Sequence, residues 1–531
     1  MNFEQGRQVP TDSVLTADVC VIGSGAAGIT LARQLSGSKL RVLIVEAGGL
    51  KQDRQTEDDC FKVQHVGVPY RNPIPSRGRW FGGSTNLWFG RIAVPDPIDF
   101  EERPWVPNSG WPVSYEQLQP WLHTASEILD VPNFEKIHLA NWRANPTIDT
   151  FVTEGAANLG VFLWARGLTM ASEHGRTIRD SANVRVLLEG TAVELVPNPD
   201  ATLIESLTVA GPLGNRFSIQ ASTFVLAAGG LENPRLLLAS RIRSAQGVGN
   251  DRGLVGRFLM DHPRGEGLAT VDLRGLSTGQ TQRLLLLGEK ARTPYGKTQL
   301  RLTFPPPMQR DEELLNHSLH AHVVTNALSD SAAYQGARRL KRRLDGSGAE
   351  PGASLREDAV AALKGVPELA QFGVRRAARR ARPTELVVID QMEQEPDALS
   401  RVMLDPMHQD RFGLPRLVVD WRISLATYRS QRRMHEMFNE ILQGAGIHTF
   451  RSQVLDRPGE LPELLDMKHP MGTTRMSGSP ATGVVDSNCR VHGVSNLYVA
   501  GSSVFPTGGH ANPTLLIIAL AARLADHIQR P

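Results

Sequence analysis

A six-residue motif, GSGAAG at residues 23–28, constrains the fold of this chain more than any other feature. The apolar run ADVCVI at 17–22 precedes it and is typical of a strand buried on both faces of a parallel sheet. Glycines at the first, third and sixth positions let the backbone turn tightly, approach a pyrophosphate and pack a following helix against the strand. We therefore expect a strand–turn–helix unit whose helix, at about 26–35, directs its first amides at the phosphates of a dinucleotide.

The residue that ends the next apolar run narrows the choice of dinucleotide. Residues 41–45, RVLIV, predict a second parallel strand, and Glu46 follows it about 20 residues after the glycine motif. A carboxylate at this place can bind both hydroxyls of an adenosine ribose and disfavours a 2′-phosphate. The sequence thus predicts an α/β fold with a Rossmann-like domain that binds FAD or NAD rather than NADP.

Composition and charge exclude several other classes of protein. The 531 residues suffice for about three domains, or for two larger ones, and a formal net charge of +3 gives no basis for nucleic-acid binding. Cys20, Cys60 and Cys489 lie far apart without a CxxC pair, so we expect no metal site and no disulfide framework. The chain begins without a signal segment, and its apolar run at 515–522 is too short to span a bilayer. We therefore expect a soluble cytoplasmic protein.

A glycine-rich aromatic loop, SRGRWFGGSTNLWFGR, occupies residues 76–91. It places two tryptophans and two phenylalanines around Gly82 and Gly83. Glycines open the backbone to a flat ring, and aromatic side chains can stack on such a ring, so we expect a flavin contact. A surface loop anchored by tryptophan is the alternative.

The middle of the chain changes character. Residues 222–240 repeat the order strand, Gly-Gly, helix, which predicts a second return to the nucleotide-binding sheet. Asp261 and His262 then precede Pro263, where a polar turn and a catalytic role are both open. From about 265 to 465, period-two runs joined by turns indicate a largely antiparallel sheet with one buried face.

The C-terminal stretch combines a histidine, a glycine-rich loop and a helix start. His469 opens HPMGTTRM, an apolar strand is expected at 496–500, and a long helix starts at Asn512 and Pro513. Polar side chains where a strand ends and a helix begins often face a ligand in an open α/β sheet. Ordinary loop histidines at 469 and 510 are the alternative.

Taken together, these segments resemble the glucose-methanol-choline (GMC) oxidoreductases, most closely their pyranose-oxidising branch. The matching segments are VIGSGAAG with Glu46, RWFGGSTNLWFGR, AAGGLENPRLLLAS, VGRFLMDHP, HPMGTTRM and LYVAGSSVFPTGGHANPTL. They extend from one end of the chain to the other. The resemblance implies a flavin domain built from both chain ends and a mostly antiparallel sheet that covers the isoalloxazine ring.

The expected domain boundaries combine this implication with the change of pattern. They are a discontinuous FAD-binding domain at 1–110, 185–265 and 465–531, a connecting helical segment at 111–184, and a substrate-binding domain at 266–464 with a basic helical insertion at about 335–382. Charge runs such as the insertion usually form solvated faces, and a lid, a dimer contact or a docking surface is the alternative.

The resemblance also implies the site residues. The histidine of its H-x-x-G-T motif falls on His469, and the histidine or asparagine at the start of the last helix falls on Asn512. We expect His469 to be the base, since a histidine pKa near 6.5 suits proton abstraction at neutral pH, Asn512 to hold the substrate oxygen, and His510 to be a second candidate. The expected cofactor-binding residues are Gly23, Gly25, Ala26, Ala27, Gly28, Glu46, Ala47, Gly82, Gly83, Ser84, Asn86, Leu87, Ala228, Gly229, Gly501, Ser502, Asn512, Pro513 and Thr514.

Three departures from the family pattern qualify these expectations. The linking histidine of some pyranose oxidases is replaced by Asn86 and Leu87, so we expect non-covalent FAD. Gly501 stands where many members have aspartate, so backbone amides would make more of the flavin contact. The helix after the second Gly-Gly runs into SRIRSAQ instead of a Ser-Gly turn, so the substrate side there differs.

The main hypothesis is FAD-dependent oxidation of the CH–OH group of a sugar, glycoside or polyol, by hydride transfer to flavin N5. A non-sugar (aryl or aliphatic) alcohol substrate, a lyase on the same fold and a flavin-binding protein without activity are the alternatives. The electron acceptor can be O2, a quinone or a redox protein, and a homo-oligomer stays open. No nucleic acid and no membrane span are expected.

Overall fold

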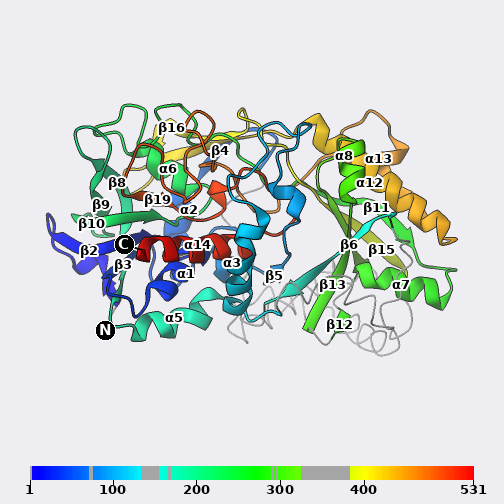
Figure 1. Ribbon diagram of the computed structural model, residues 1–531, viewed down its shortest axis with the longest axis horizontal. Coiled ribbons are helices and arrows are strands. Elements are labelled where there is room, and N and C mark those ends of the chain that lie inside the picture. Colours follow the sequence, from blue (N-terminus) through cyan, green and yellow to red (C-terminus); the bar gives the residue numbers. More distant parts are fainter. Residues whose placement is uncertain are drawn as a thin grey trace, which may run out of the picture.

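The computed structural model describes residues 3–70, 76–132, 155–165, 169–288, 291–293, 296–324 and 383–530. Two eight-stranded sheets dominate it and lie toward opposite ends of an elongated molecule (Figure 1). The predicted basic insertion at 335–382 lies outside the described residues.

The first sheet is mostly parallel, as the glycine motif predicts. Its strands, in sheet order, are β1 (Phe3–Gln5), β7 (Val184–Leu188), β3 (Val42–Val45), β2 (Val14–Ile22), β10 (Arg216–Leu226), β9 (Ile204–Ala210) and β8 (Thr191–Pro197), and β19 (Leu497–Val499) also pairs with β10. The pairs from β1 to β10, and β10 with β19, are parallel, whereas β9 and β8 are antiparallel. Residues 19–22 of β2 are at most 4% exposed, in agreement with a strand covered on both faces.

Helices cover this sheet and bring the two ends of the chain together. Helix α1 (Ala26–Leu35) has the predicted bounds and contacts both α14 (Thr514–Gln529) and α5 (Met170–Asp180). Helix α14 also contacts α3 (Tyr115–Ile128), which begins with a capping box of Ser114 and Gln117. The shorter helices of the chain are η1 (Gly6–Gln8), α2 (Arg54–Cys60), η3 (Gly83–Asn86), η4 (Pro97–Phe100), α6 (Glu232–Ala239), α8 (Pro306–Asp311), α13 (Gln453–Asp456) and η6 (Ser502–Val504).

The second sheet is antiparallel throughout. Its strands, in sheet order, are β18 (Phe450–Ser452), β11 (Arg264–Asp272), β15 (Glu385–Gln391), β14 (Ser318–Val324), β13 (Gly296–Thr303), β6 (Asn158–Trp164) and β5 (Arg91–Ile92), with β12 (Ala291–Thr293) beside β13. Helix α7 (Thr278–Gly288) packs on β13 and β14, and α12 (Leu425–Gly444) contacts β18. Because β5 and β6 come from the first part of the chain, this sheet joins segments that are far apart in the sequence (Figure 1).

A third sheet corrects one expectation of the sequence. Two of the runs within 265–465 do form strands, β16 (Arg401–Gln409) and β17 (Pro415–Trp421), but they do not join the large antiparallel sheet. They pair with each other, and β17 pairs in parallel with β4 (Val63–Gly67). A period of two predicts a strand with one buried face, and it does not specify the partner strand.

Within the described ranges, every helix is too short or too polar to cross a lipid bilayer.

Candidate active site

The glycine motif forms an open cradle at the end of β2. Gly23 has a φ of 105°, and a Cβ on Gly28 would lie 1.9 Å from the carbonyl oxygen of Gly23, so both positions require glycine. A Cβ on Gly25 would meet no protein atom within 4 Å. The open side of the cradle therefore lies at Gly25, where a pyrophosphate can approach the backbone.

The aromatic loop packs directly on this cradle. The amide of Gly82 donates to the carbonyl of Ser24 at 3.2 Å, and a Cβ on Gly83 would lie 2.9 Å from the Cα of Gly25. Asn86 folds back within the loop, where its Nδ2 donates to the carbonyl of Phe81 at 3.0 Å. The loop therefore packs closely on the nucleotide cradle, as a flavin contact requires.

Glu46 lies at the end of β3 beside the cradle. It is 5% exposed and accepts hydrogen bonds from the amides of Ser24 at 3.1 Å and Gly48 at 2.8 Å. These amides fix the carboxylate, and an ionised carboxylate has further acceptor sites on both oxygens. The cradle and this fixed carboxylate together fit the pyrophosphate and ribose of FAD.

Asn233 connects the two remaining loops that are predicted to bind the cofactor, a role that sequence reasoning missed. Its Oδ1 accepts from the amide of Ala228 at 2.8 Å, and its Nδ2 donates to the carbonyl of Ala500 at 3.2 Å and to the Oγ of Ser503 at 3.0 Å. The side chain is fully buried in α6. Its position in GGLENP, directly after a Gly-Gly turn, was the available signal.

His469 is held by a neighbouring histidine. Its Nδ1 lies 2.9 Å from the Nδ1 of His262, and the two rings meet edge to face with centroids 5.1 Å apart. The contact exists because Met260 and Met471 pair in an antiparallel bridge with backbone hydrogen bonds of 3.0 and 2.8 Å. His262, for which a plain polar turn was also open, thus lies beside the predicted base.

Asp261 fixes the backbone of both histidine segments. It is fully buried and accepts from the amides of His262 at 2.7 Å, Met467 at 2.9 Å and His469 at 2.8 Å, and from the hydroxyl of Tyr70 at 2.5 Å. Burial raises the pKa of Asp261 to about 7, with a further contribution from Asp466, while these hydrogen bonds oppose the rise. The carboxylate therefore holds His469 in place without touching its ring.

Burial keeps both rings neutral at neutral pH. It is the largest cause that lowers the pKa of His469 well below its ordinary value, and His262 and Arg91 lower it further. Burial, with a contribution from His510, lowers the pKa of His262 to about 3. Since Nδ1 of His469 is engaged with His262, Nε2 is the ring nitrogen of His469 that remains for a substrate.

Asn512 is oriented from the antiparallel sheet. It is 8% exposed, and its Oδ1 accepts from the Nε2 of Gln391 at 3.3 Å, so its NH2 group is left for a ligand. Gln391 also donates to the carbonyl of His510 at 2.6 Å. Gln391, at the end of β15, is a second residue of the site that sequence reasoning missed.

His510 is engaged elsewhere. Its Nε2 lies 2.8 Å from Oδ2 of Asp96, and its side chain is fully buried. Burial, together with Arg301, lowers the pKa of His510, and Asp96 opposes this. The structure thus pairs His510 with a carboxylate, whereas the ring of His469 pairs with a neutral imidazole.

One face of the antiparallel sheet is polar where it meets these residues. Strand register and contacts place six side chains on it: Arg91, Phe162, Arg264, Arg301, His320 and Gln391. The Nη2 of Arg91 donates to the Oε1 of Gln391 at 2.8 Å, and Gln391 in turn donates to Asn512. These two hydrogen bonds connect the sheet to Asn512.

Comparison with known proteins identifies the family. A family model described as GMC oxidoreductase matches residues 396–521, and one described as FAD dependent oxidoreductase matches residues 18–248. The chain belongs to the GMC oxidoreductases. It is therefore an FAD-dependent oxidoreductase of the class that acts on CH–OH groups, and the predicted family, fold class and FAD dependence are confirmed.

Relatives and solved structures cover nearly the whole of this GMC oxidoreductase. The fructose dehydrogenase large subunit of Gluconobacter japonicus is 23% identical over 98% of this chain and 98% of its own length. The 2-methyl-1,2-propanediol dehydrogenase of Mycolicibacterium austroafricanum is 24% identical over 98% of this chain and 96% of its own. A formate oxidase structure from Aspergillus oryzae, determined to study FAD modification, has a TM-score of 0.57 at 17% identity and covers 98% of this chain and 99% of its own.

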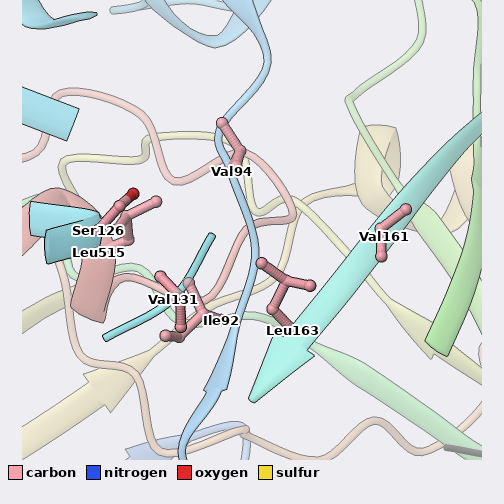
Figure 2. Close-up of a pocket in the computed structure, with 7 residues that line it drawn as sticks. All are labelled: Ile92, Val94, Ser126, Val131, Val161, Leu163 and Leu515. Atoms are coloured by element: carbon pink, nitrogen blue, oxygen red, sulfur yellow. The ribbon is translucent and has the colours of Figure 1, made fainter. Parts of the chain in front are cut away.

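The GMC oxidoreductase also has an apolar pocket (Figure 2). Its lining comes from β5, β6, α3 and α14 and the loops that follow β5 and α3: Ile92, Val94, Ser126, Val131, Val161, Leu163 and Leu515. Ile92 and Leu163 are opposite each other in register, so they point away from the face that carries Arg91. Its one hydroxyl, on Ser126, donates to the carbonyl of Leu122 at 2.9 Å, so this pocket offers no group for alcohol oxidation.

Proposed function

We propose that the protein oxidises a CH–OH group of a sugar, glycoside or polyol. The orientation of His469 and Asn512 by two further side chains, His262 and Gln391, carries this proposal. The names of the fructose and propanediol dehydrogenases support the substrate class. An aryl or aliphatic alcohol is the alternative substrate.

His469 takes the hydroxyl proton at Nε2. When bound, FAD supplies the acceptor for the hydride that leaves the same carbon. The pKa of His469 lies well below its ordinary value, so the ring is already unprotonated at neutral pH and can accept a proton. The rate of substrate oxidation should rise with pH only in the acidic range and be flat above neutrality, because the base is fully deprotonated there.

The tautomer of the histidine pair follows from this role. Two neutral rings that face each other through Nδ1 share one proton, so one ring donates and the other accepts. We assign the donor role to His469, which leaves its Nε2 as an unprotonated base. His262 then carries its proton on Nε2, which lies near the backbone of Gly508 and Gly509 and makes no hydrogen bond of standard geometry to the described residues.

Asn512 holds the substrate oxygen. The Gln391 amide fixes its Oδ1, so the NH2 group of Asn512 can donate to the oxygen as its proton leaves. Base and donor then act on the same oxygen, one removing the proton and the other stabilising the charge that develops.

FAD is bound without a covalent link in this proposal. The 76–91 loop, which packs on the cradle, contains no histidine, cysteine or tyrosine to form a bond with the flavin ring. Asn86 and Leu87 stand where a linking histidine would be needed.

Anaerobic flavin reduction tests the proposal. Purified protein with bound FAD should be bleached by one or more neutral sugars, glycosides or polyols, and His469→Ala should reduce its flavin about 10²–10⁴-fold more slowly. Asn512→Ala should be about 10²–10³-fold slower, with normal FAD content in both variants. A His469→Ala enzyme at near wild-type rate would reject the base, and FAD that no alcohol bleaches would reject oxidation and leave the lyase alternative.

A further inference from the structure

Arg91 makes an unusual set of contacts on the polar face of the antiparallel sheet. Its Nη2 donates to the Oε1 of Gln391 at 2.8 Å, its Nη1 lies 3.1 Å from the Nε2 of His320, and its guanidinium lies 4.3 Å from the ring centroid of Phe162. An amide, a neutral imidazole and an aromatic ring surround it, and none of these carries a negative charge. Burial and nearby cations hold the pKa of His320 well below its ordinary value, so this ring stays neutral.

The neighbouring charges that act on Arg91 are positive, like its own. Burial, with contributions from Arg264 and Arg301, lowers the pKa of Arg91 to about 10. Arg264 pairs with Glu266, and Arg301 faces the carboxylates of Asp96 and Asp99. Across the part of the chain that the structure describes, no carboxylate pairs with Arg91. A half-buried cation without a counter-ion is unfavourable, so a ligand that supplies the negative charge gains from binding there.

The position of Arg91 ties this cation to the reacting atoms. The side-chain amide of Gln391 accepts from Arg91 through Oε1 and donates to Asn512 through Nε2, so Arg91 and Asn512 lie on two sides of one amide group. The charge of Arg91 also acts on His469. A group bound at Arg91 therefore lies within the length of one small molecule from the oxygen that His469 and Asn512 would contact.

We propose that Arg91 binds a carboxylate of the alcohol substrate, which makes the substrate a sugar acid or polyol acid rather than a neutral sugar. This inference rests on the proposed function and narrows its substrate class. The planar guanidinium presents paired donors that match a carboxylate, and Phe162 and Gln391 hold its plane in place. The hydroxyl to be oxidised would lie at Asn512 while the acid group is anchored at Arg91.

Matched acid and neutral substrates test the inference. Anaerobic flavin reduction is measured for wild type, Arg91→Gln and Arg91→Lys with D-glucuronate and D-gluconate, against D-glucose and D-glucitol as neutral analogues and glucose 6-phosphate as a second anion. The control variant is Arg243→Gln, since Arg243 pairs with Glu205 on the nucleotide-binding sheet. FAD content and far-UV circular dichroism establish that each variant is folded and loaded.

We expect the wild-type enzyme to use a carboxylate substrate at least 10-fold more efficiently than its neutral analogue. Arg91→Gln should lower the efficiency about 10- to 150-fold for the acid and less than threefold for the neutral analogue, and Arg91→Lys should recover part of the loss, because a charged hydrogen bond contributes about 1.5–3 kcal/mol. Arg243→Gln should match wild type.

Four results would overturn the inference in distinguishable ways. Bleaching by the neutral compounds but not by either acid would reject the carboxylate and keep the proposed function, and preference for the phosphate would replace the carboxylate by another anion. Equal losses for acid and neutral substrates in Arg91→Gln would mean that Arg91 only stabilises charge that develops during oxidation. Bleaching by none of the compounds, with FAD bound, would reject both the inference and the proposed function.

Discussion

Replacing His262 tests whether this residue controls the position of the ring proton of His469 or the pKa of His469. In the proposed mechanism, His262 accepts the Nδ1 proton of His469, so that Nε2 is free to act as the base. His262→Leu removes this acceptor and replaces it with an apolar side chain of similar size. His262→Asn keeps an acceptor, because the Oδ1 of asparagine can occupy the place of the imidazole Nδ1.

The expected magnitude follows from the cost of an unpaired donor. In His262→Leu, the competent tautomer of His469 would leave a buried N–H without an acceptor, which costs about 1–3 kcal/mol. The other tautomer, with its proton on Nε2, would then dominate, and the rate of flavin reduction should fall about 5- to 150-fold. His262→Asn should recover most of this loss.

Stopped-flow flavin reduction under anaerobic conditions, from pH 6 to 9, measures both effects. Because burial remains the largest cause of the low pKa of His469, the profile of His262→Leu should be flat above neutrality and lie below that of the wild type. FAD content should be normal, and His174→Leu, which removes a histidine bonded to the carbonyl of Ile128, should be as fast as the wild type.

Two outcomes would refute this reasoning. If raising the pH restored the rate of His262→Leu, the variant would have changed the pKa of His469 and not its tautomer. If His262→Asn were as slow as His262→Leu with FAD fully bound, His262 would support the fold alone, because an acceptor at Nδ1 would then make no difference.

Three further predictions concern the cofactor and the donor. Acid precipitation should release the flavin into the supernatant, and flavin that stays in the pellet would contradict non-covalent binding. Glu46→Ala should lose FAD during dialysis faster than Glu46→Gln, because each charge-assisted bond to ribose contributes about 1.5–3 kcal/mol, and full retention by both variants would reject the role of Glu46. Gln391→Met should free the Asn512 amide to rotate and slow flavin reduction about 2- to 13-fold at unchanged FAD content, as expected for one lost neutral hydrogen bond, and an unchanged rate would show that Asn512 needs no such support.

Local patterns predicted the nucleotide-binding half of the molecule well. The bounds of α1 depend on residues within one or two turns of the helix, and they were predicted from those residues. The capping box of α3 is encoded just as locally, by Ser114 and Gln117. The strand at 17–22 was recognisable because a strand covered on both faces is continuously apolar. Such features are encoded over short stretches, so a single sequence suffices to find them.

Long-range pairing produced the features that the sequence did not reveal. His262 reaches His469 only because Met260 and Met471 pair across 211 positions of the chain. Gln391 and Arg91 meet because β5 and β15 share a sheet with five other strands on its main path. Period-two patterns predict that such strands exist, and they leave order and register open.

Different parts of the structure support the two halves of the site, His469 on one side and Asn512 with Arg91 on the other. The proposed base and the groups that select the substrate can therefore change independently. Asp261, His262 and Tyr70 hold His469 through contacts that do not involve the antiparallel sheet. Asn512 and any group bound at Arg91 depend on that sheet through Gln391. Substitutions on the polar face of the sheet can therefore change which alcohol is oriented while the base keeps its tautomer, and burial, the largest cause, still keeps the pKa of His469 low. A change at His262, by contrast, alters the proposed base His469 and so affects every substrate alike.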